Sequence, residues 1–162
     1  MAAPTDNDPV QQKPLGGVLE MVVVIVHDGQ DCDCLAFEGI GENTADRFAR
    51  RIDKSKPGAK DFRSPHELQS QMELKSAKAK CKYRGISINL VGNHEAAIIK
   101  KYAEQRAFSP QGQKGYYCEF TFKDDAGKVW DTRTDKNPTH YTFFKCEAFT
   151  TKRIKVVKVV PI

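Results

Sequence analysis

Residues 115–149, GYYCEFTFKDDAGKVWDTRTDKNPTHYTFFKCEAF, contain three segments rich in aromatic and β-branched side chains. These segments span residues 116–122, 128–134 and 140–149. The intervening residues 124–127 and 135–138 carry Asp, Gly, Asn and Pro, which suit tight turns. The stretch therefore predicts an antiparallel sheet with Cys118 near one end and Cys146 near the other.

Further strands and two helices are predicted elsewhere. The continuous β-branched run at residues 18–26 is typical of a strand buried on both faces, and residues 82–91 and 151–162 predict two more strands. Apolar residues at helical spacing predict helices at residues 44–53 and 94–108, with Arg50 and Arg51 on the outer face of the first. We therefore expect an α+β fold in which an antiparallel sheet packs against one or two helices. Residues 1–15 predict a flexible tail, and residues 16–162 a single globular domain.

The charge of the chain leaves its class of partner open. The 162 residues carry a formal net charge of +5, which permits contact with RNA or an acidic surface, although a small lysine excess more often serves solubility. The basic cluster at residues 54–60 has the same two readings, a solvated face or a phosphate contact. No apolar run approaches the roughly 20 residues that a membrane span needs, so we expect no membrane partner.

Five cysteines, at positions 32, 34, 81, 118 and 146, carry the clearest hint of cellular context. They form no CxxC pair and no His cluster, so we expect no metal and no cofactor. We favour the interpretation that the cysteines form two disulfides and leave one unpaired in a secreted domain. The opening residues, MAAPT, resemble a mature N-terminus after removal of a signal peptide, with Met1 added for expression.

Residues that could bind or cleave RNA are few. His140 in Thr-His-Tyr-Thr resembles one half of a phosphodiesterase HxT pair, but the sequence has no second half. Aromatic side chains of the 115–149 stretch could stack on bases, although about half of them must form the core of a one-sided sheet. The candidate binding residues are Arg84, Tyr117, Trp130, Arg133 and Tyr141.

The order of short motifs over residues 32–146 resembles the fungal guanyl-specific ribonuclease and ribotoxin superfamily, which includes RNase-like effectors of plant-pathogenic fungi. The motifs are Asp33-Cys34, Thr44-Ala45 with Ala49-Arg50, Ser64-Pro65-His66, Cys81 before a central strand, residues 117–127, and Phe143-Phe144-Lys145-Cys146. The resemblance implies an RNase-like fold with disulfides Cys34–Cys146 and Cys81–Cys118, and it leaves Cys32 unpaired.

The resemblance also implies a chemistry in which a carboxylate base and an imidazole acid act on a phosphodiester. Only His66 falls on a catalytic landmark of the family, and Arg84 or Gly85 stands where the central-strand glutamate belongs. A shifted register offers Glu119 as base and His140 as acid, with Arg133 between them. The resemblance therefore implies a fold whose catalytic set is mostly lost.

These observations predict a secreted fungal effector with an RNase-like fold that is catalytically inactive and binds a host protein or RNA. We expect a monomer that acts outside the cell or after translocation into host cells. The alternative is an active secreted endoribonuclease that uses His66, Glu119 and His140. A disulfide-stapled structural or inhibitory module is the third possibility.

Overall fold

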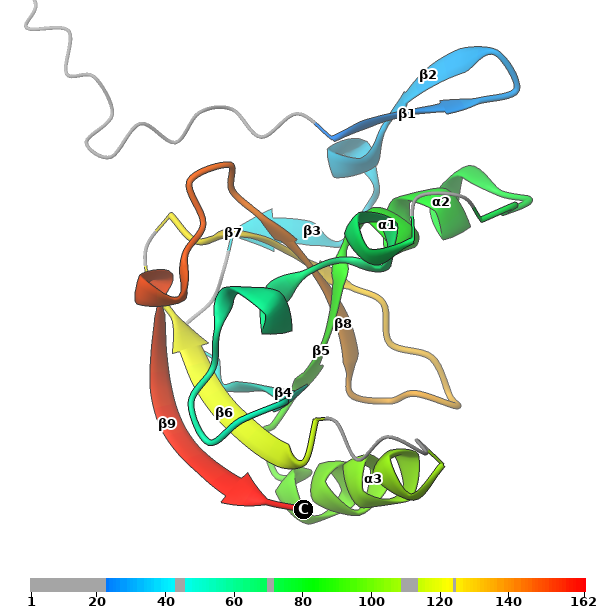
Figure 1. Cartoon of the computed structure of the whole chain (residues 1–162). Coiled ribbons are helices and arrows are strands. Elements are labelled where there is room, and N and C mark those ends of the chain that lie inside the picture. The colour runs from blue at the N-terminus through cyan, green and yellow to red at the C-terminus, as the bar shows by residue number, and fades with distance from the viewer. Residues whose placement is uncertain (1–22, 43–45, 70–71, 109–113, 124) are drawn as a thin grey trace, which may run out of the picture.

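The structure is a computed structural model that describes residues 23–42, 46–69, 72–108, 114–123 and 125–162 (Figure 1). Its strands are β1 (Val24–His27), β2 (Gln30–Asp33), β3 (Ile40–Glu42), β4 (Phe48–Ile52), β5 (Ile86–Leu90), β6 (Tyr116–Phe122), β7 (Gly127–Asp131), β8 (His140–Lys145) and β9 (Ile154–Pro161). Its α-helices are α1 (Pro65–Leu68), α2 (Ala77–Arg84) and α3 (Glu95–Ala107), and short 3-10 turns occupy Cys34–Ala36, Ala59–Phe62 and Thr151–Arg153.

Seven strands form one antiparallel sheet in the order β3-β7-β8-β5-β4-β6-β9, while β1 and β2 form a separate two-stranded ribbon. The sheet curves strongly, with α3 at one end of the molecule and α1 and α2 near the ribbon at the other (Figure 1). The predicted α+β class with an antiparallel sheet is confirmed. No helix in the described residues is long and apolar enough to cross a membrane.

The alternation of side chains along the strands divides the interior into separate clusters. Phe48 and Ile52 of β4 belong to the largest cluster, which also holds Phe120 of β6. Ala49 lies between them in the sequence and packs on the other face, with Tyr102 of α3. This period of two is what a sheet covered on both faces requires. The curved sheet thus holds the largest cluster on one face, and α3 covers part of the other face.

The predicted helix at residues 44–53 is wrong, because Phe48–Ile52 is strand β4. Phe48 and Ile52 are four residues apart, a spacing that places two side chains on one side of a helix and equally on one face of a strand. Pairing decides between the two: β4 runs between β5 and β6 in the sheet. Arg50 and Arg51 consequently point to opposite faces of a strand rather than outward from a helix.

Two other predicted strands differ from the structure, one in its bounds and one in its burial. The first three residues of the predicted strand at 82–91 belong to helix α2, which ends at Arg84 with Gly85 as its C-cap, and only Ile86–Leu90 is strand. Of the predicted strand at 18–26, residues 18–22 lie outside the described residues. The remainder forms β1, in which Ile25 is buried but Val24 and Val26 are 44% and 63% exposed, so burial on both faces is wrong there.

The 115–149 stretch does form three strands, but they are not successive neighbours. β7 pairs with β8, whereas β6 lies between β4 and β9. Both edges of β6 are therefore occupied by segments far from it in sequence. The predicted helix at 94–108 and the final strand are confirmed as α3 and β9.

The predicted disulfides are both wrong. Cys34 bonds to Cys81, with their Cα atoms 5.4 Å apart, and Cys118 and Cys146 are buried free thiols. Cys34 and Cys81 share a cluster with Trp130 and Phe144, which joins α2 to the β7–β8 part of the sheet. Cys118 faces the largest cluster instead. The prediction that Cys32 is unpaired is confirmed.

Candidate anion-binding site

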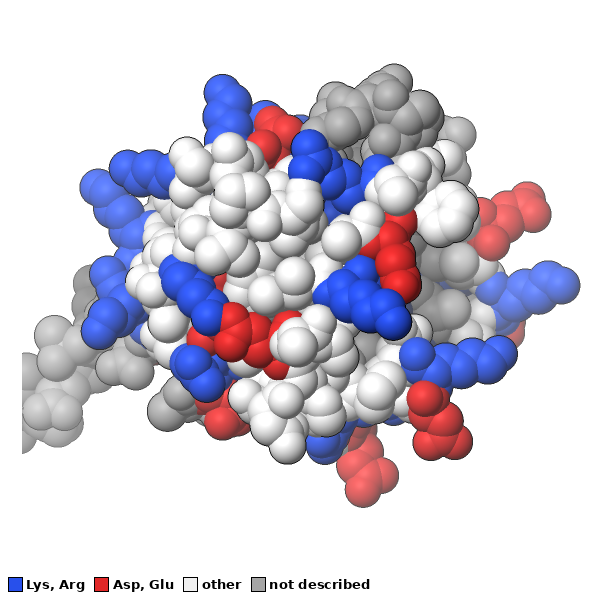
Figure 2. Space-filling view, turned by 90° about the horizontal axis from the view of Figure 1, so that it is seen from below, with Lys and Arg blue, Asp and Glu red and all other residues white. Residues whose placement is uncertain are grey.

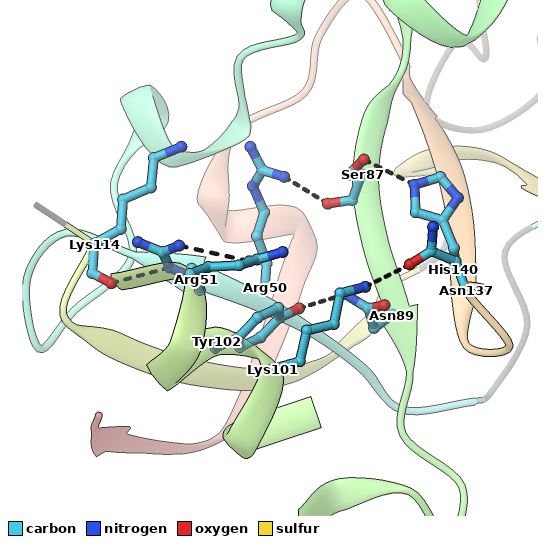
Figure 3. Close-up of a pocket in the computed structure, with 10 residues that line it drawn as sticks. Arg50, Arg51, Ser87, Asn89, Lys101, Tyr102, Lys114, Asn137 and His140 are labelled. Atoms are coloured by element: carbon cyan, nitrogen blue, oxygen red, sulfur yellow. Dashed lines mark hydrogen bonds between the residues drawn. The ribbon is translucent and has the colours of Figure 1, made fainter. Parts of the chain in front are cut away.

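Strands β4 and β5 pair only at Phe48–Leu90 and Ala49–Asn89. Beyond these pairs, β4 continues along β6 while β5 continues along β8. A hollow of about 330 Å³ opens at this divergence (Figure 3). Its ten lining residues are Arg50, Arg51, Ser87, Asn89, Lys101, Tyr102, Gln105, Lys114, Asn137 and His140.

The charge of this hollow is one-sided. Four of the lining side chains are Arg or Lys, and none is Asp or Glu. Burial lowers the pKa of both arginines and both lysines, and Arg50 and Arg51 lower the pKa of Lys114 further. The carboxylate of Asp61 partly offsets the charge of Arg50 and Lys114, but it already accepts hydrogen bonds from the backbone N–H groups of Asp53 and Gly58. An anion would therefore be stabilised here.

Arg50 forms the fixed back wall of the hollow. Its Nε donates to the carbonyl oxygen of Asp61, and its Nη1 donates to that of Ser87 at 2.5 Å. Because β5 has no β4 partner at Ser87, the guanidinium takes the place of a strand hydrogen bond. The charge of Arg50 is consequently held in place before any ligand arrives.

A chain of buried hydrogen bonds makes the base of the hollow. Asn89 Nδ2 donates to the phenol oxygen of Tyr102 at 2.6 Å, and the Tyr102 hydroxyl donates to the Ala49 carbonyl at 3.1 Å. Thr139 Oγ1 donates to Asn89 Oδ1 at 2.9 Å. Burial raises the pKa of Tyr102 to about 12, so the phenol is neutral at physiological pH and adds no negative charge.

The remaining cations are held by oxygen atoms around the rim. Arg51 Nε donates to the Lys114 carbonyl at 3.3 Å, and Arg51 Nη1 approaches Gln105 Oε1 at 3.5 Å. Lys101 Nζ donates to Asn137 Oδ1 at 3.1 Å. These oxygen atoms belong to uncharged groups, and they orient the cations at the rim.

His140 occupies the opposite wall, between two hydroxyl groups. Its Nε2 lies 2.9 Å from Ser87 Oγ, and its Nδ1 lies 2.7 Å from Thr132 Oγ1. The pKa of His140 is lowered, first by burial and then by Lys101 and Lys82. The imidazole is therefore neutral near pH 7 and able to take up a proton as the pH falls.

The lowered pKa of His140 predicts how the stability of the fold depends on pH. Below the ordinary histidine pKa of about 6.5, the unfolded chain binds a proton that native His140 still resists, so the fold loses stability as the pH falls. We expect His140→Gln to lose less free energy of unfolding than the wild type between pH 7 and pH 5. Urea unfolding at both pH values measures this, and equal losses in the two proteins would contradict it.

The three residues considered as a catalytic set lie in three different environments. His66 packs edge-on against Tyr83, with ring centroids 6.1 Å apart, and lines another hollow with Arg84 beside β1 and α2. Glu119 is fully buried on β6, where Arg47 donates to it at 2.6 Å and the Tyr117 hydroxyl at 2.9 Å. Of the three, only His140 lines the cationic hollow.

The aromatic residues considered for base stacking are mostly internal. Tyr117 and Trp130 are 0% and 2% exposed, so neither ring can stack on a base. Tyr141 is half-buried, and the guanidinium of Arg133 lies 5.3 Å from its ring centre. Arg133 is also bound to Asp131 through two hydrogen bonds of 2.9 and 2.7 Å. These rings and charges are already engaged within the protein.

Sequence reasoning found His140 but missed the cations around it. The sequence predicts Arg50 and Arg51 on the outer face of a helix, and it marks neither Lys101 nor Lys114 as a site residue. The lining residues come from positions 50 to 140, and no local motif links them. The one sequence signal is the Arg-Arg pair at 50–51, which is informative only once it is known to lie on a strand.

No family model, curated protein or solved structure matches this chain. The ribonuclease resemblance therefore stays a prediction. The site has to be interpreted from the chemistry of its own residues.

Proposed function

We propose that this protein is a secreted, non-catalytic RNA-binding effector that holds an RNA phosphate in the hollow between β4 and β5. The observation that carries the proposal is the presence of four cationic side chains and no carboxylate among the ten lining residues. Phosphate oxygens are the dominant source of affinity in protein–nucleic acid contacts, and Arg and Lys are their usual partners. A host protein with an exposed anionic group is the competing ligand.

Binding without cleavage is favoured by the separation of the acid–base candidates. General acid–base cleavage needs two groups within hydrogen-bond reach of one phosphodiester. Glu119 is engaged with Arg47 and Tyr117, and His66 lines a different hollow from His140. A nuclease assay on single-stranded RNA tests this part: intact RNA is expected, and cleavage that is lost in His140→Gln would contradict it.

Secretion is supported by the Cys34–Cys81 disulfide, because such bonds persist mainly in oxidising compartments. The effector role comes from the family resemblance. Peptide mapping of protein recovered from the medium of the producing cells tests secretion. We expect the Cys34–Cys81 cross-linked peptide there, and recovery of the protein only from inside the cells would contradict secretion.

RNA affinity is expected to depend on Lys101 and Lys114. We expect Lys101→Gln/Lys114→Gln to bind a short single-stranded RNA at least about 10-fold more weakly, since each charged hydrogen bond contributes about 1.5–3 kcal/mol. The slope of log K against log salt should also fall by about 1.4, because each lost contact to single-stranded RNA removes roughly 0.7. Fluorescence anisotropy over a salt series measures both quantities.

The matched control is Lys152→Gln/Lys155→Gln, which removes the same charge from two exposed lysines beside and on β9. This control should bind RNA nearly as well as the wild type. Equal losses in the two double variants would show that net charge, rather than the hollow, provides the affinity. A wild type that does not bind RNA would favour a protein ligand.

A further inference from the structure

We infer that the hollow accepts a terminal phosphate monoester of RNA rather than an internal phosphodiester, an inference that rests on the proposed function. Two observations carry it: the hollow is walled on several sides, and its positive charge is concentrated.

The walls of the hollow come from five separate segments. Figure 3 shows Lys114 and Arg51 on one side, Ser87 and His140 on the other, and Lys101 with Tyr102 below them in this view. A protein that follows an internal stretch of RNA needs a positively charged groove along which the backbone can continue in both directions. A hollow of about 330 Å³ bounded by β4, β5, α3 and the approaches to β6 and β8 is better suited to the end of a chain.

The charge in the hollow matches a monoester better than a diester. A phosphate diester carries one negative charge, whereas a monoester carries about 1.5 to 2 at pH 7 and offers three terminal oxygens as acceptors. Four cations line the hollow, and Arg50 is fixed by two backbone carbonyls. Because burial weakens the solvation of these cations, the more highly charged ligand gains the larger interaction energy.

Some of the cations outside the hollow are paired with carboxylates. Figure 2 shows acidic side chains among basic ones over the centre and right of the face seen from below, and basic side chains along its left edge. Among the described residues, the ion pairs formed by Lys or Arg are Arg47–Glu119, Lys60–Asp53, Arg133–Asp131, Lys145–Glu67 and Lys158–Glu95. These pairs offset the charge of five cations outside the hollow, whereas no carboxylate is among the described residues that line the hollow.

The test compares three RNA oligonucleotides of one sequence that differ only at their ends. One carries hydroxyl groups at both ends, one a 5′-phosphate and one a 3′-phosphate. We expect wild-type protein to bind one or both phosphorylated oligonucleotides at least about 10-fold more tightly than the hydroxyl form, and the two arms identify the end that is recognised. The preference should disappear in Lys101→Gln/Lys114→Gln and persist in Lys152→Gln/Lys155→Gln.

The outcomes separate this inference from the proposed function. Equal affinity for all three oligonucleotides, still dependent on Lys101 and Lys114, would overturn the terminal-phosphate inference and leave RNA binding intact. No binding to any of them would overturn both. Thermal unfolding of each variant identifies one that has lost its fold, and the milder single change Lys101→Gln, at a half-buried position of α3, then takes its place in the comparison.

Discussion

Replacing both Cys34 and Cys81 with alanine is expected to lower the free energy of unfolding by about 4 kcal/mol. The bond closes a loop with a sequence separation of 47 residues, and opening it enlarges the set of conformations available to the unfolded chain. Urea unfolding of the wild type and the double variant under non-reducing conditions measures the difference. Dithiothreitol should destabilise the wild type and leave the double variant unchanged.

Cys146→Ala is the informative control, because Cys146 was the partner of Cys34 implied by the family resemblance. In the structure it is a free thiol, so its replacement should cost only about 1 kcal/mol for the lost buried sulfur. A loss for Cys146→Ala as large as for the double variant would mean that Cys34 pairs with Cys146 instead. Cys32→Ser, at a partly exposed position, should change stability by about 0.5 kcal/mol or less.

Gly127→Ala is expected to destabilise the protein by about 4 kcal/mol, through backbone strain and a steric clash together. Gly127 has φ of +154°, which side-chain-bearing residues rarely adopt. An added Cβ would lie 2.0 Å from the Phe144 carbonyl oxygen and 3.0 Å from the Lys145 Cα. Both atoms are backbone of the paired strand β8, so relief would require β7 and β8 to separate.

Gly41→Ala is the matched control for that substitution. Gly41 lies on β3, the neighbour of β7, and an added Cβ there would meet no atom within 4 Å. Its stability should stay within about 0.5 kcal/mol of the wild type. Thermal and urea unfolding compare the two variants, and similar behaviour of both would show that the close approach of β7 and β8 is not essential to the fold.

Local sequence patterns were sufficient to predict an element where the spacing of its apolar residues fits either a helix or a strand, but not both. Helix α3 was predictable because its apolar residues recur over several turns between Gly-Asn and Pro-Gln-Gly, which are typical of turns. Strands β6 to β8 were predictable from aromatic and β-branched runs separated by turn residues. Strand β4 was not, since Phe48 and Ile52 fit either period, and its true neighbours lie more than thirty positions away.

The cationic hollow could not have been predicted in the same way. It exists because β4 leaves β5 after two residue pairs, and strand pairing of this kind depends on the whole sheet. The same dependence explains the wrong disulfides: the ribonuclease resemblance implied a bond between Cys34 and Cys146, but the packing of α2 places Cys34 against Cys81.

The sequence alone determined the α+β class, helix α3, the aromatic strands of residues 115–149 and the presence of His140 as a candidate site residue. These depend on short-range periodicity and turn chemistry, which a few neighbouring residues define. Only the tertiary structure decided that β6 and β7 lie apart, that Cys34 bonds to Cys81, and that Arg50, Arg51, Lys101 and Lys114 surround one hollow with His140. The physical reason is that strand order and helix packing bring together residues that are distant in the sequence. This packing decides which charged side chains surround a site.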